Sequence, residues 1–340
     1  MSGVPLVSIL MVARNTGPFI GEAIDSARAQ SCADIEIVVV DDASSDDTKA
    51  IALSHAAQDA RVRVLDGPRA GLAAVRNASL AAARGQWVLI LDSDDVLAPD
   101  HVAQLVEAAR RSGATMVAAN MIEFQEDHGA WQTQPFASGP AWEAERRIDL
   151  AEFIDANRMF SHGVTLGYLK PLFLRHFMDD HGLRYDTELR VGEDFDLVLR
   201  AMLAGGALLY VPKPTYFYRR HAASTSARFS LSSLSALMVA AASYPLPDDA
   251  KVQQAARRYA ASLGVALRLG RGVEALKARR PGTALTELGL SAQAWWQLAC
   301  SAREGLARRL HNRLARPASA ASAQPLTVHL NSATGKAVSS

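Results

Sequence analysis

The chain has 340 residues, 49% of them hydrophobic and 21% charged, which suits one large α/β domain with an appendage, or two domains. Its formal net charge of +1 excludes a strong overall attraction to nucleic acid. The two cysteines, Cys32 and Cys300, lie far apart in the sequence, which argues against a disulfide framework and favours a reducing compartment.

Strands and helices alternate through the first 120 residues. Apolar, β-branched runs predict strands at Leu6–Ala13, Ile35–Val40, Arg61–Leu65, Trp87–Leu91 and Thr115–Asn120. The intervening segments have helical spacing at Ile20–Ala29, Asp46–Ala57, Gly71–Arg84 and His101–Ser112. Nearly continuous apolar strands that alternate with helices predict a mainly parallel sheet covered on both faces.

Polar side chains occur where three of these strands end. They are Asn15, Asp41, Asp42, Asp92 and Asp94. Ligands of such sheets bind beyond the carboxyl ends of the strands. We therefore expect these residues to converge on one binding site.

The segment Asp92-Ser93-Asp94-Asp95 places three carboxylates directly after a buried strand. Like charges this close raise one another's pKa unless a cation lies between them. An Asp-x-Asp pattern suits Mg²⁺ or Mn²⁺, which proteins usually bind together with substrate phosphates. Taken alone, the motif is explained more simply as an acidic turn that caps the next helix. The other motifs shift the balance toward a metal site.

Several motifs occur in the order typical of family 2 glycosyltransferases. The strings VSILMVARN, EIVVVDDASSDDT, GLAAVRNASLAAARGQWVLILDSDD and YDTELRVGEDFDLVLRAMLAGGALLYVPKPTYFYRRHAAST, within residues 4–226, resemble this family. The resemblance implies the GT-A fold, an α/β, Rossmann-like, mixed and mainly parallel sheet flanked by helices. It also implies an enzyme that transfers a sugar from a nucleotide diphosphate with inversion, similar to bacterial enzymes of exopolysaccharide and surface-glycan synthesis.

The resemblance also implies a donor site. Asp42 corresponds to an Asp that accepts a hydrogen bond from the base, and Asp41 either shares this role or orients the loop. Arg76 would pair with the diphosphate, although Arg76 and Asn77 could equally be packing or solvent-facing residues. The nucleotide-sugar-binding residues implied are Ala13, Asn15, Asp41, Asp42, Arg76, Asn77, Asp92, Ser93, Arg219 and Arg220.

The implied cofactor is Mg²⁺ or Mn²⁺. Asp94 would be its main ligand, Asp92 would contact the ribose or the ion, and His221 would be a third ligand. A His after two Arg is equally typical of a solvated loop. Asp95 either supports the ligands or begins the next helix.

The partners implied are a nucleotide-diphosphate sugar and a glycan or polyprenyl-linked acceptor, without nucleic acid. Val12 and Arg14 replace the small hydroxyl and Tyr-like residues that usually follow the first strand in this family. The resemblance implies a UDP-sugar as the donor, but this departure at residues that would contact the base leaves GDP- and dTDP-sugars open.

The motif Gly192-Glu193-Asp194 carries the second half of the implied chemistry. Asp194 would take the proton of the acceptor hydroxyl, and Glu193 would position the acceptor or tune its neighbour. Apolar spacing from Phe195 to Leu203 predicts a helix that begins here, and its dipole would favour an ionised Asp194. An ordinary acidic helix start is the alternative.

We predict a catalytic domain over residues 1–228, with a nucleotide-binding half of about 1–120 and an acceptor half of about 121–228. A helical region over 229–316 and a disordered tail over 317–340 follow. Helical spacing occurs at Leu231–Ala242, Ala250–Leu269, Val273–Arg279 and Ala292–His311, with breaks at Pro245, Pro247, Pro281 and Gly282.

A cytoplasmic location is expected, because no apolar run reaches the roughly 18–20 residues of a membrane span. Val4–Val12 also lacks the basic leader of a signal peptide. The basic, Trp-containing helix expected over Trp295–Arg313 either lies on the cytoplasmic face of the inner membrane or packs on the catalytic domain.

Three other functions compete with sugar transfer. A nucleotidyltransferase would carry a Gly-rich phosphate loop after the first strand, where this chain has Ala13-Arg14-Asn15-Thr16-Gly17. A dinucleotide oxidoreductase would carry G-x-G-x-x-G there. A catalytically degenerate assembly protein of a glycan-synthesis complex stays open, although Asp92, Asp94 and Asp194 are intact.

Overall fold

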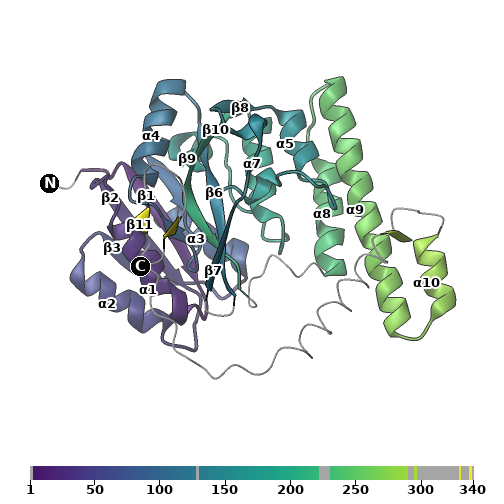
Figure 1. The fold of residues 1–340 in the computed structure, drawn as a ribbon, viewed down its shortest axis with the longest axis horizontal. Coiled ribbons are helices and arrows are strands. Elements are labelled where there is room, and N and C mark those ends of the chain that lie inside the picture. The colour runs from purple at the N-terminus through teal and green to yellow at the C-terminus, as the bar shows by residue number, and fades with distance from the viewer. Residues whose placement is uncertain are drawn as a thin grey trace.

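A mixed β-sheet forms the centre of the molecule (Figure 1). Its strand order is β3-β2-β1-β4-β9-β6-β10-β5. Helices flank it, which confirms the predicted fold class. The computed structural model describes residues 3–127, 130–221, 230–289, 295–296, 329–330 and 337–338.

One half of the sheet is parallel. Its strands are β1 (Val7–Ala13), β2 (Ile35–Asp41), β3 (Val62–Asp66) and β4 (Trp87–Ile90). The connecting helices are α1 (Gly17–Arg28), α2 (Thr48–Gln58) and α3 (Leu72–Ala82). Every residue of β2 is buried, because both faces of the sheet are covered. These elements agree with the predicted ranges to within three residues at each end.

The other half of the sheet mixes strand directions. Strand β9 (Leu172–Leu174) runs antiparallel to both β4 and β6 (Met116–Asp127), and β6 runs parallel to β10 (Leu208–Arg219). Three short strands pair antiparallel at the margins, namely β5 (Val96–Leu97), β7 (Ala130–Pro135) and β8 (Arg146–Ile148). The helices here are α4 (His101–Ser112), α5 (Leu150–Ala156), α6 (Arg175–Asp180) and α7 (Glu193–Leu203), with short 3-10 helices at Pro140–Trp142 and Leu166–Tyr168.

Three C-terminal helices pack together on the α5 side of the molecule (Figure 1). They are α8 (Leu231–Ser243), α9 (Ala250–Lys277) and α10 (Pro281–Leu288). The prediction of separate helices at Ala250–Leu269 and Val273–Arg279 is wrong, because α9 is continuous. Gly270 and Gly272 do not break it: a Cβ would lie 2.5 Å from Leu231 on α8 and 2.9 Å from Leu288 on α10, respectively. Glycine thus permits close helix packing.

A proline expected to break the chain instead begins a helix. Pro281 lies at the first position of α10, where its fixed φ angle fits and its missing N–H costs nothing. The predicted helix over Ala292–His311 lies outside the described residues except for Trp295 and Trp296. The tail predicted over 317–340 also lies outside them, except for the paired strands β11 (His329–Leu330) and β12 (Ala337–Val338).

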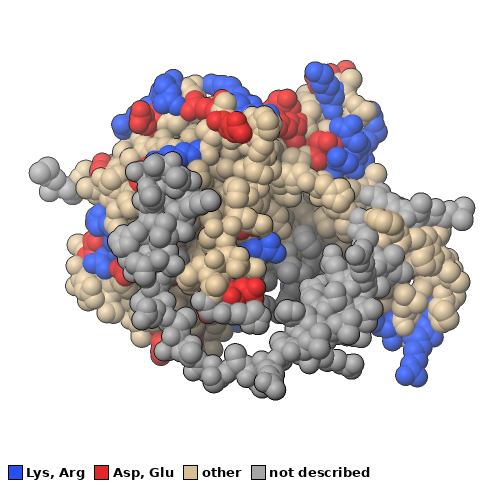
Figure 2. Space-filling model, viewed as in Figure 1, with Lys and Arg blue, Asp and Glu red and all other residues tan. Residues whose placement is uncertain are grey.

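Charged side chains of both signs are intermixed along the upper edge of the face shown in Figure 2, over α4, β8 and α5. This mixture agrees with the net charge of +1. No helix within the described ranges combines the length and the apolar character that a bilayer span requires.

The buried side chain of His101 makes the stability of this fold depend on pH. The side chain is 1% exposed, and its Nδ1 lies 2.7 Å from Thr215 Oγ1. Burial lowers the pKa of His101 to about 3, whereas an unfolded His titrates near pH 6.5. The unfolded chain therefore binds the extra proton between about pH 6.5 and 3. The stability that neutral His101 contributes is complete above this window and is lost as the pH falls through it.

We predict that His101→Gln makes the free energy of unfolding less dependent on pH in this window, by up to about 1.4 kcal/mol per pH unit. Urea unfolding between pH 7 and 4 measures the slope. His176→Gln is the control, because the His176 side chain is 82% exposed. Equal slopes for the wild type and His101→Gln would contradict the lowered pKa.

Candidate active site

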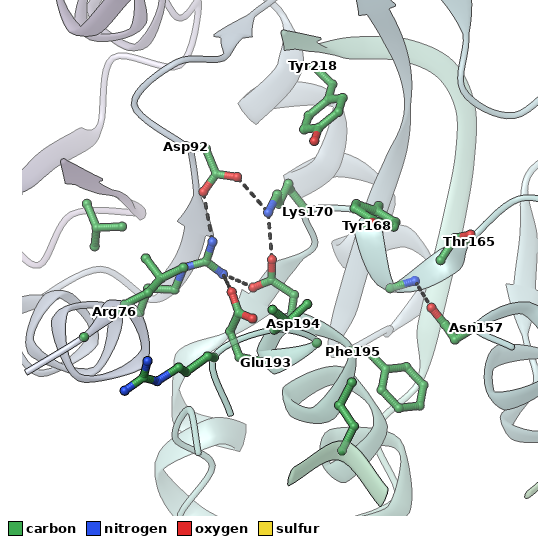
Figure 3. Close-up of a pocket in the computed structure, with 18 of the residues that line it drawn as sticks. Arg76, Asp92, Asn157, Thr165, Tyr168, Lys170, Glu193, Asp194, Phe195 and Tyr218 are labelled. Carbon is green, nitrogen blue, oxygen red and sulfur yellow. Dashed lines mark hydrogen bonds and ion pairs between the residues drawn. The ribbon is translucent and has the colours of Figure 1, made fainter. Parts of the chain in front are cut away.

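A cavity of about 690 Å³ opens at the carboxyl ends of β1, β2 and β4. Of the five polar strand-end residues, Asp42, Asp92 and Asp94 line it, whereas Asn15 and Asp41 do not. Figure 3 shows Lys170 and Asp194 between Asp92 on one side and Tyr168 and Thr165 on the other. The cavity therefore extends from the strand ends past Asp194 into the second half of the molecule.

Two cations and three carboxylates form a buried ion cluster in this cavity, which we call the Arg76–Lys170 cluster. Lys170 Nζ lies 2.8 Å from Asp92 Oδ2 and 2.7 Å from Asp194 Oδ2 (Figure 3). Arg76 Nη2 lies 3.1 Å from Asp92 Oδ1, and Nη1 pairs with Asp194 and, at 3.6 Å, with Glu193 Oε1. Helix α3, the end of β4, the segment before β9 and helix α7 are thereby joined.

The pKa values of the two adjacent acids in the cluster, Glu193 and Asp194, are shifted in opposite directions. Burial disfavours the charged form of Asp194, but Arg76 and Lys170 outweigh it and hold the pKa of Asp194 at about 2. Burial and the adjacent Asp194 charge raise the pKa of Glu193. Asp194 is therefore held as a carboxylate, while Glu193 is the more easily protonated of the pair.

Asp194 is placed by a helix start, as predicted. Gly192 has φ +79°, a left-handed conformation that glycine adopts without strain, and α7 begins directly after it. The Tyr185 hydroxyl donates a hydrogen bond of 3.2 Å to Asp194 Oδ1. Asn77 holds Tyr185 in turn, with its side chain hydrogen-bonded at 2.8 Å to both the N–H and the carbonyl of that residue. The carbonyl and the NH₂ of the Asn77 side chain are thus both hydrogen-bonded to Tyr185, and Asn77 does not line the cavity. Its predicted role in donor binding is therefore not supported.

The predicted metal ligands are only partly brought together. His221 Nε2 lies 2.8 Å from Asp94 Oδ2, so these two could share an ion. Both oxygens of Asp92 instead pair with Arg76 and Lys170, and Asp92 does not join Asp94 in a ligand set. Among the described residues no three His, Cys, Asp or Glu side chains form a metal-binding group. One carboxylate and one imidazole nevertheless fit an ion that takes its other ligands from a diphosphate.

Asp95 supports the acidic turn rather than beginning a helix. It is 1% exposed, accepts the Tyr216 hydroxyl at 2.6 Å, and accepts the backbone N–H of Arg219 at 2.8 Å. Burial and the charges of Asp94 and Asp92 raise the pKa of Asp95 well above its usual range. These bonds fasten the end of β10 to the turn that follows β4.

The predicted donor contacts of Arg219 and Arg220 are not supported, because neither lines the cavity. The Arg219 guanidinium donates to Glu22 Oε2 at 2.5 Å and to the Asp94 carbonyl at 2.7 Å, and it stacks on Phe124 at 4.5 Å. Arg220 lies 3.4 Å from Glu123, and 56% of its side chain is exposed. Arg219 thus holds the acidic turn in place from a position outside the cavity lining.

The end of β2 separates its two neighbouring carboxylates. Asp42 lines the cavity and accepts the backbone N–H of Arg69 at 2.7 Å. Asp41 does not line the cavity and accepts the N–H of Ser44 at 3.2 Å, which favours the loop-orienting alternative. Asn15 does not line the cavity either; its side-chain oxygen accepts the N–H of Ser45 at 2.8 Å.

The remaining predicted donor residues, Ala13 and Ser93, line the cavity, as does Arg14. Sequence reasoning did not assign a role to Lys170, which lies at the centre of the site and is 7% exposed. The available signal was a single lysine within the otherwise apolar segment Leu166–Leu174. A buried lysine requires carboxylate partners, and the sequence did not show which ones were close.

We predict that Lys170→Met lowers the free energy of unfolding by about 3–5 kcal/mol, because it leaves the partly buried carboxylates of Asp92 and Asp194 with less compensation. Denaturant unfolding measures this change. Lys213→Met is the matched control: Lys213 pairs with Asp100 at the surface, and its loss should cost under about 1 kcal/mol. Similar effects of the two substitutions would contradict a structural role for the cluster.

Comparisons with known proteins agree with this architecture. The model of glycosyl transferase family 2 matches residues 8–177, half of the chain. The succinoglycan biosynthesis protein ExoO of Rhizobium meliloti is 36% identical over 242 residues, which cover 70% of this chain and 67% of that protein. ExoU of the same organism is 36% identical, over 59% of this chain and 58% of its own length. The putative glycosyltransferase EpsH of Bacillus subtilis is 31% identical, over 66% of this chain and 64% of its own.

Solved structures show the same fold at low sequence identity. S. aureus TarS 1–349 in complex with UDP-GlcNAc superposes with a TM-score of 0.61 at 16% identity, covering 86% of this chain and 92% of that one. The mannosyltransferase PcManGT of Pyrobaculum calidifontis, in complex with GDP-Man and Mn²⁺, gives 0.56 at 18% identity, covering 92% and 84%. The chain therefore belongs to glycosyl transferase family 2, has the GT-A fold and is a glycosyltransferase.

Proposed function

We propose that this enzyme transfers a sugar, with inversion, from a nucleotide-diphosphate sugar to a hydroxyl of a glycan or lipid-linked acceptor. The observation that carries the proposal is the position of Asp194. It lies at the start of α7, in one cavity with the acidic turn after β4, and Lys170 bridges it to Asp92. A base and a donor site that share one cavity can act on the same bond.

In the proposed reaction the acceptor oxygen attacks the anomeric carbon as the bond to the diphosphate breaks. The nucleotide diphosphate leaves with the bonding electrons, and the Asp194 carboxylate takes the hydroxyl proton. Arg76 and Lys170, which hold Asp194 ionised, also line the cavity. Their positive charges can pair with the diphosphate, and this would weaken their hold on Asp194 and make it a stronger base.

The donor is proposed to be a UDP-sugar that binds along the strand ends. Asp42 would accept a hydrogen bond from the base. Arg14, which is 66% exposed and lies 3.8 Å from Asp42, would cover the base. Asp94 and His221 would hold Mg²⁺ or Mn²⁺, which would neutralise charge on the departing diphosphate. TarS with UDP-GlcNAc and PcManGT with GDP-Man and Mn²⁺ support donors of this class.

A role in bacterial exopolysaccharide biosynthesis is supported by the names of ExoO and ExoU. Such a pathway would place the enzyme in the cytoplasm or on the cytoplasmic face of the inner membrane. The proposed membrane contact through Trp295–Arg313 lies mostly outside the described residues, where only Trp295 and Trp296 are placed; these are 39% and 68% exposed.

We predict that Asp194→Asn binds the nucleotide sugar with near-unchanged affinity but transfers it about 10²–10⁴-fold more slowly, the usual worth of a positioned general base. The amide keeps the shape of the side chain but cannot take the proton. Calorimetric donor affinity and single-turnover transfer, measured together, separate binding from chemistry. Wild-type transfer would dismiss Asp194 as the base, and lost donor binding would move the search for a base to Glu193.

We also predict that Asp94→Asn weakens metal-dependent donor binding, because it removes the charged member of the Asp94–His221 pair. The donor is first found by screening UDP-glucose, UDP-galactose, UDP-GlcNAc and GDP-mannose, with Mn²⁺ or with chelator, for a raised Tm. Full activity of Asp94→Asn, or full activity of the wild type in excess chelator, would contradict the metal role. Donor binding without any turnover would favour the alternative, a degenerate assembly protein.

A further inference from the structure

The helix start that bears Glu193 and Asp194 carries a third acid with different partners. Asp196 is 2% exposed and does not line the cavity. Arg200 donates to its Oδ2 at 2.9 and 2.6 Å, and the Tyr244 hydroxyl donates to its Oδ1 at 2.9 Å. A carboxylate as deeply buried as that of Asp196 requires such partners, so they help to hold the first turn of α7.

Tyr244 comes from outside the sheet domain, at the C-terminal end of α8. Burial and the neighbouring Asp196 raise the pKa of Tyr244, so its hydroxyl keeps its proton and remains a donor. Tyr244 does not line the cavity. It therefore contacts α7 through Asp196, outside the cavity lining.

Two apolar contacts reach the same turn from the C-terminal helices. Leu237 of α8 lies so close to Gly192 that a Cβ on that glycine would be 2.7 Å from its Cδ2. Tyr259 of α9 packs on Phe195 with ring centroids 5.0 Å apart. The residues that flank Glu193 and Asp194 are thus contacted by α8, by α9 and by Tyr244 at the end of α8.

We infer that the C-terminal helices α8 and α9 complete the active site, with Tyr244 and Leu237 acting as positioning residues for Glu193 and Asp194. The inference rests on the proposed role of Asp194. Loss of the Tyr244 hydroxyl leaves one oxygen of buried Asp196 without its partner, so the first turn of α7 shifts or frays and Asp194 leaves its position. The family match ends at residue 177 and assigns nothing to these helices.

The test uses the full-length chain and Tyr244→Phe, which removes only the hydroxyl. We expect the turnover number for the donor found by screening to fall about 10–100-fold, the cost of misplacing a catalytic group by about 1 Å. The affinities for UDP and GDP, each with Mn²⁺, should stay within about twofold. Tyr210→Phe is the matched control, because its buried hydroxyl donates to the Trp142 carbonyl, away from α7. This control should keep wild-type turnover.

A second pair of variants removes apolar contacts from the same helix. Leu237→Ala should lower turnover, whereas Leu234→Ala, equally buried on α8 but not in the cavity lining, should lower Tm without lowering turnover. Wild-type turnover of Tyr244→Phe, or an equal loss of turnover in Tyr244→Phe and Tyr210→Phe, would overturn the inference.

Hydrogen exchange separates this inference from the proposed function. The backbone amides of residues 193–197 should exchange faster in Tyr244→Phe than in the wild type, and those in Tyr210→Phe should not. Should the wild type turn over no nucleotide sugar, the proposed function fails, while the exchange data still decide whether Tyr244 holds the turn. Unchanged exchange in Tyr244→Phe would overturn the positioning role independently of any activity.

Discussion

The Arg76–Lys170 cluster is the interaction on which this active site depends. Ionised groups are rarely buried without partners, because desolvation costs several kcal/mol for each ion. Arg76 is 4% exposed and Lys170 is 7% exposed, and each contacts carboxylates from two different elements. Arg76 and Asp92 come from the first half of the sheet, whereas Lys170 and Asp194 come from the second half, 118 residues on for the Arg76–Asp194 pair. The cluster therefore forms only when both halves of the sheet have assembled.

Outside the cluster, hydrogen bonds from residues that do not line the cavity hold the acidic turn and Asp194 in place. Asp95 and Arg219 fasten the acidic turn to β10. Asn77 accepts a hydrogen bond from the backbone of Tyr185, and the Tyr185 hydroxyl in turn donates to Asp194. The cavity lining itself therefore contains the charged groups of the cluster and the space for substrates. This division explains why several polar residues of the recognised motifs do not line the cavity: they hold the ones that do.

The C-terminal helices extend the same arrangement. Leu237 and Tyr259 belong to the main hydrophobic core and also line the cavity. Asn157 and Gly167 also line the cavity, with the Gly167 N–H donating to the Asn157 side chain at 2.8 Å. The wall of the cavity beyond Asp194 is therefore built from segments that the family match only partly covers.

The sequence determined the alternating elements of the first half, the acidic turn after β4 and the helix start at Glu193, because each depends on local spacing and on neighbours in the chain. It could not show that Asp92 pairs with Lys170, or that Arg219 faces Glu22, because a charge selects its partner only after distant elements pack. Continuity of α9 likewise depended on Leu231 and Leu288 lying against its glycines. Residue types and order decided which chemistry was available; the tertiary structure decided which side chains faced the cavity, since burial requires every charge to find a partner in space.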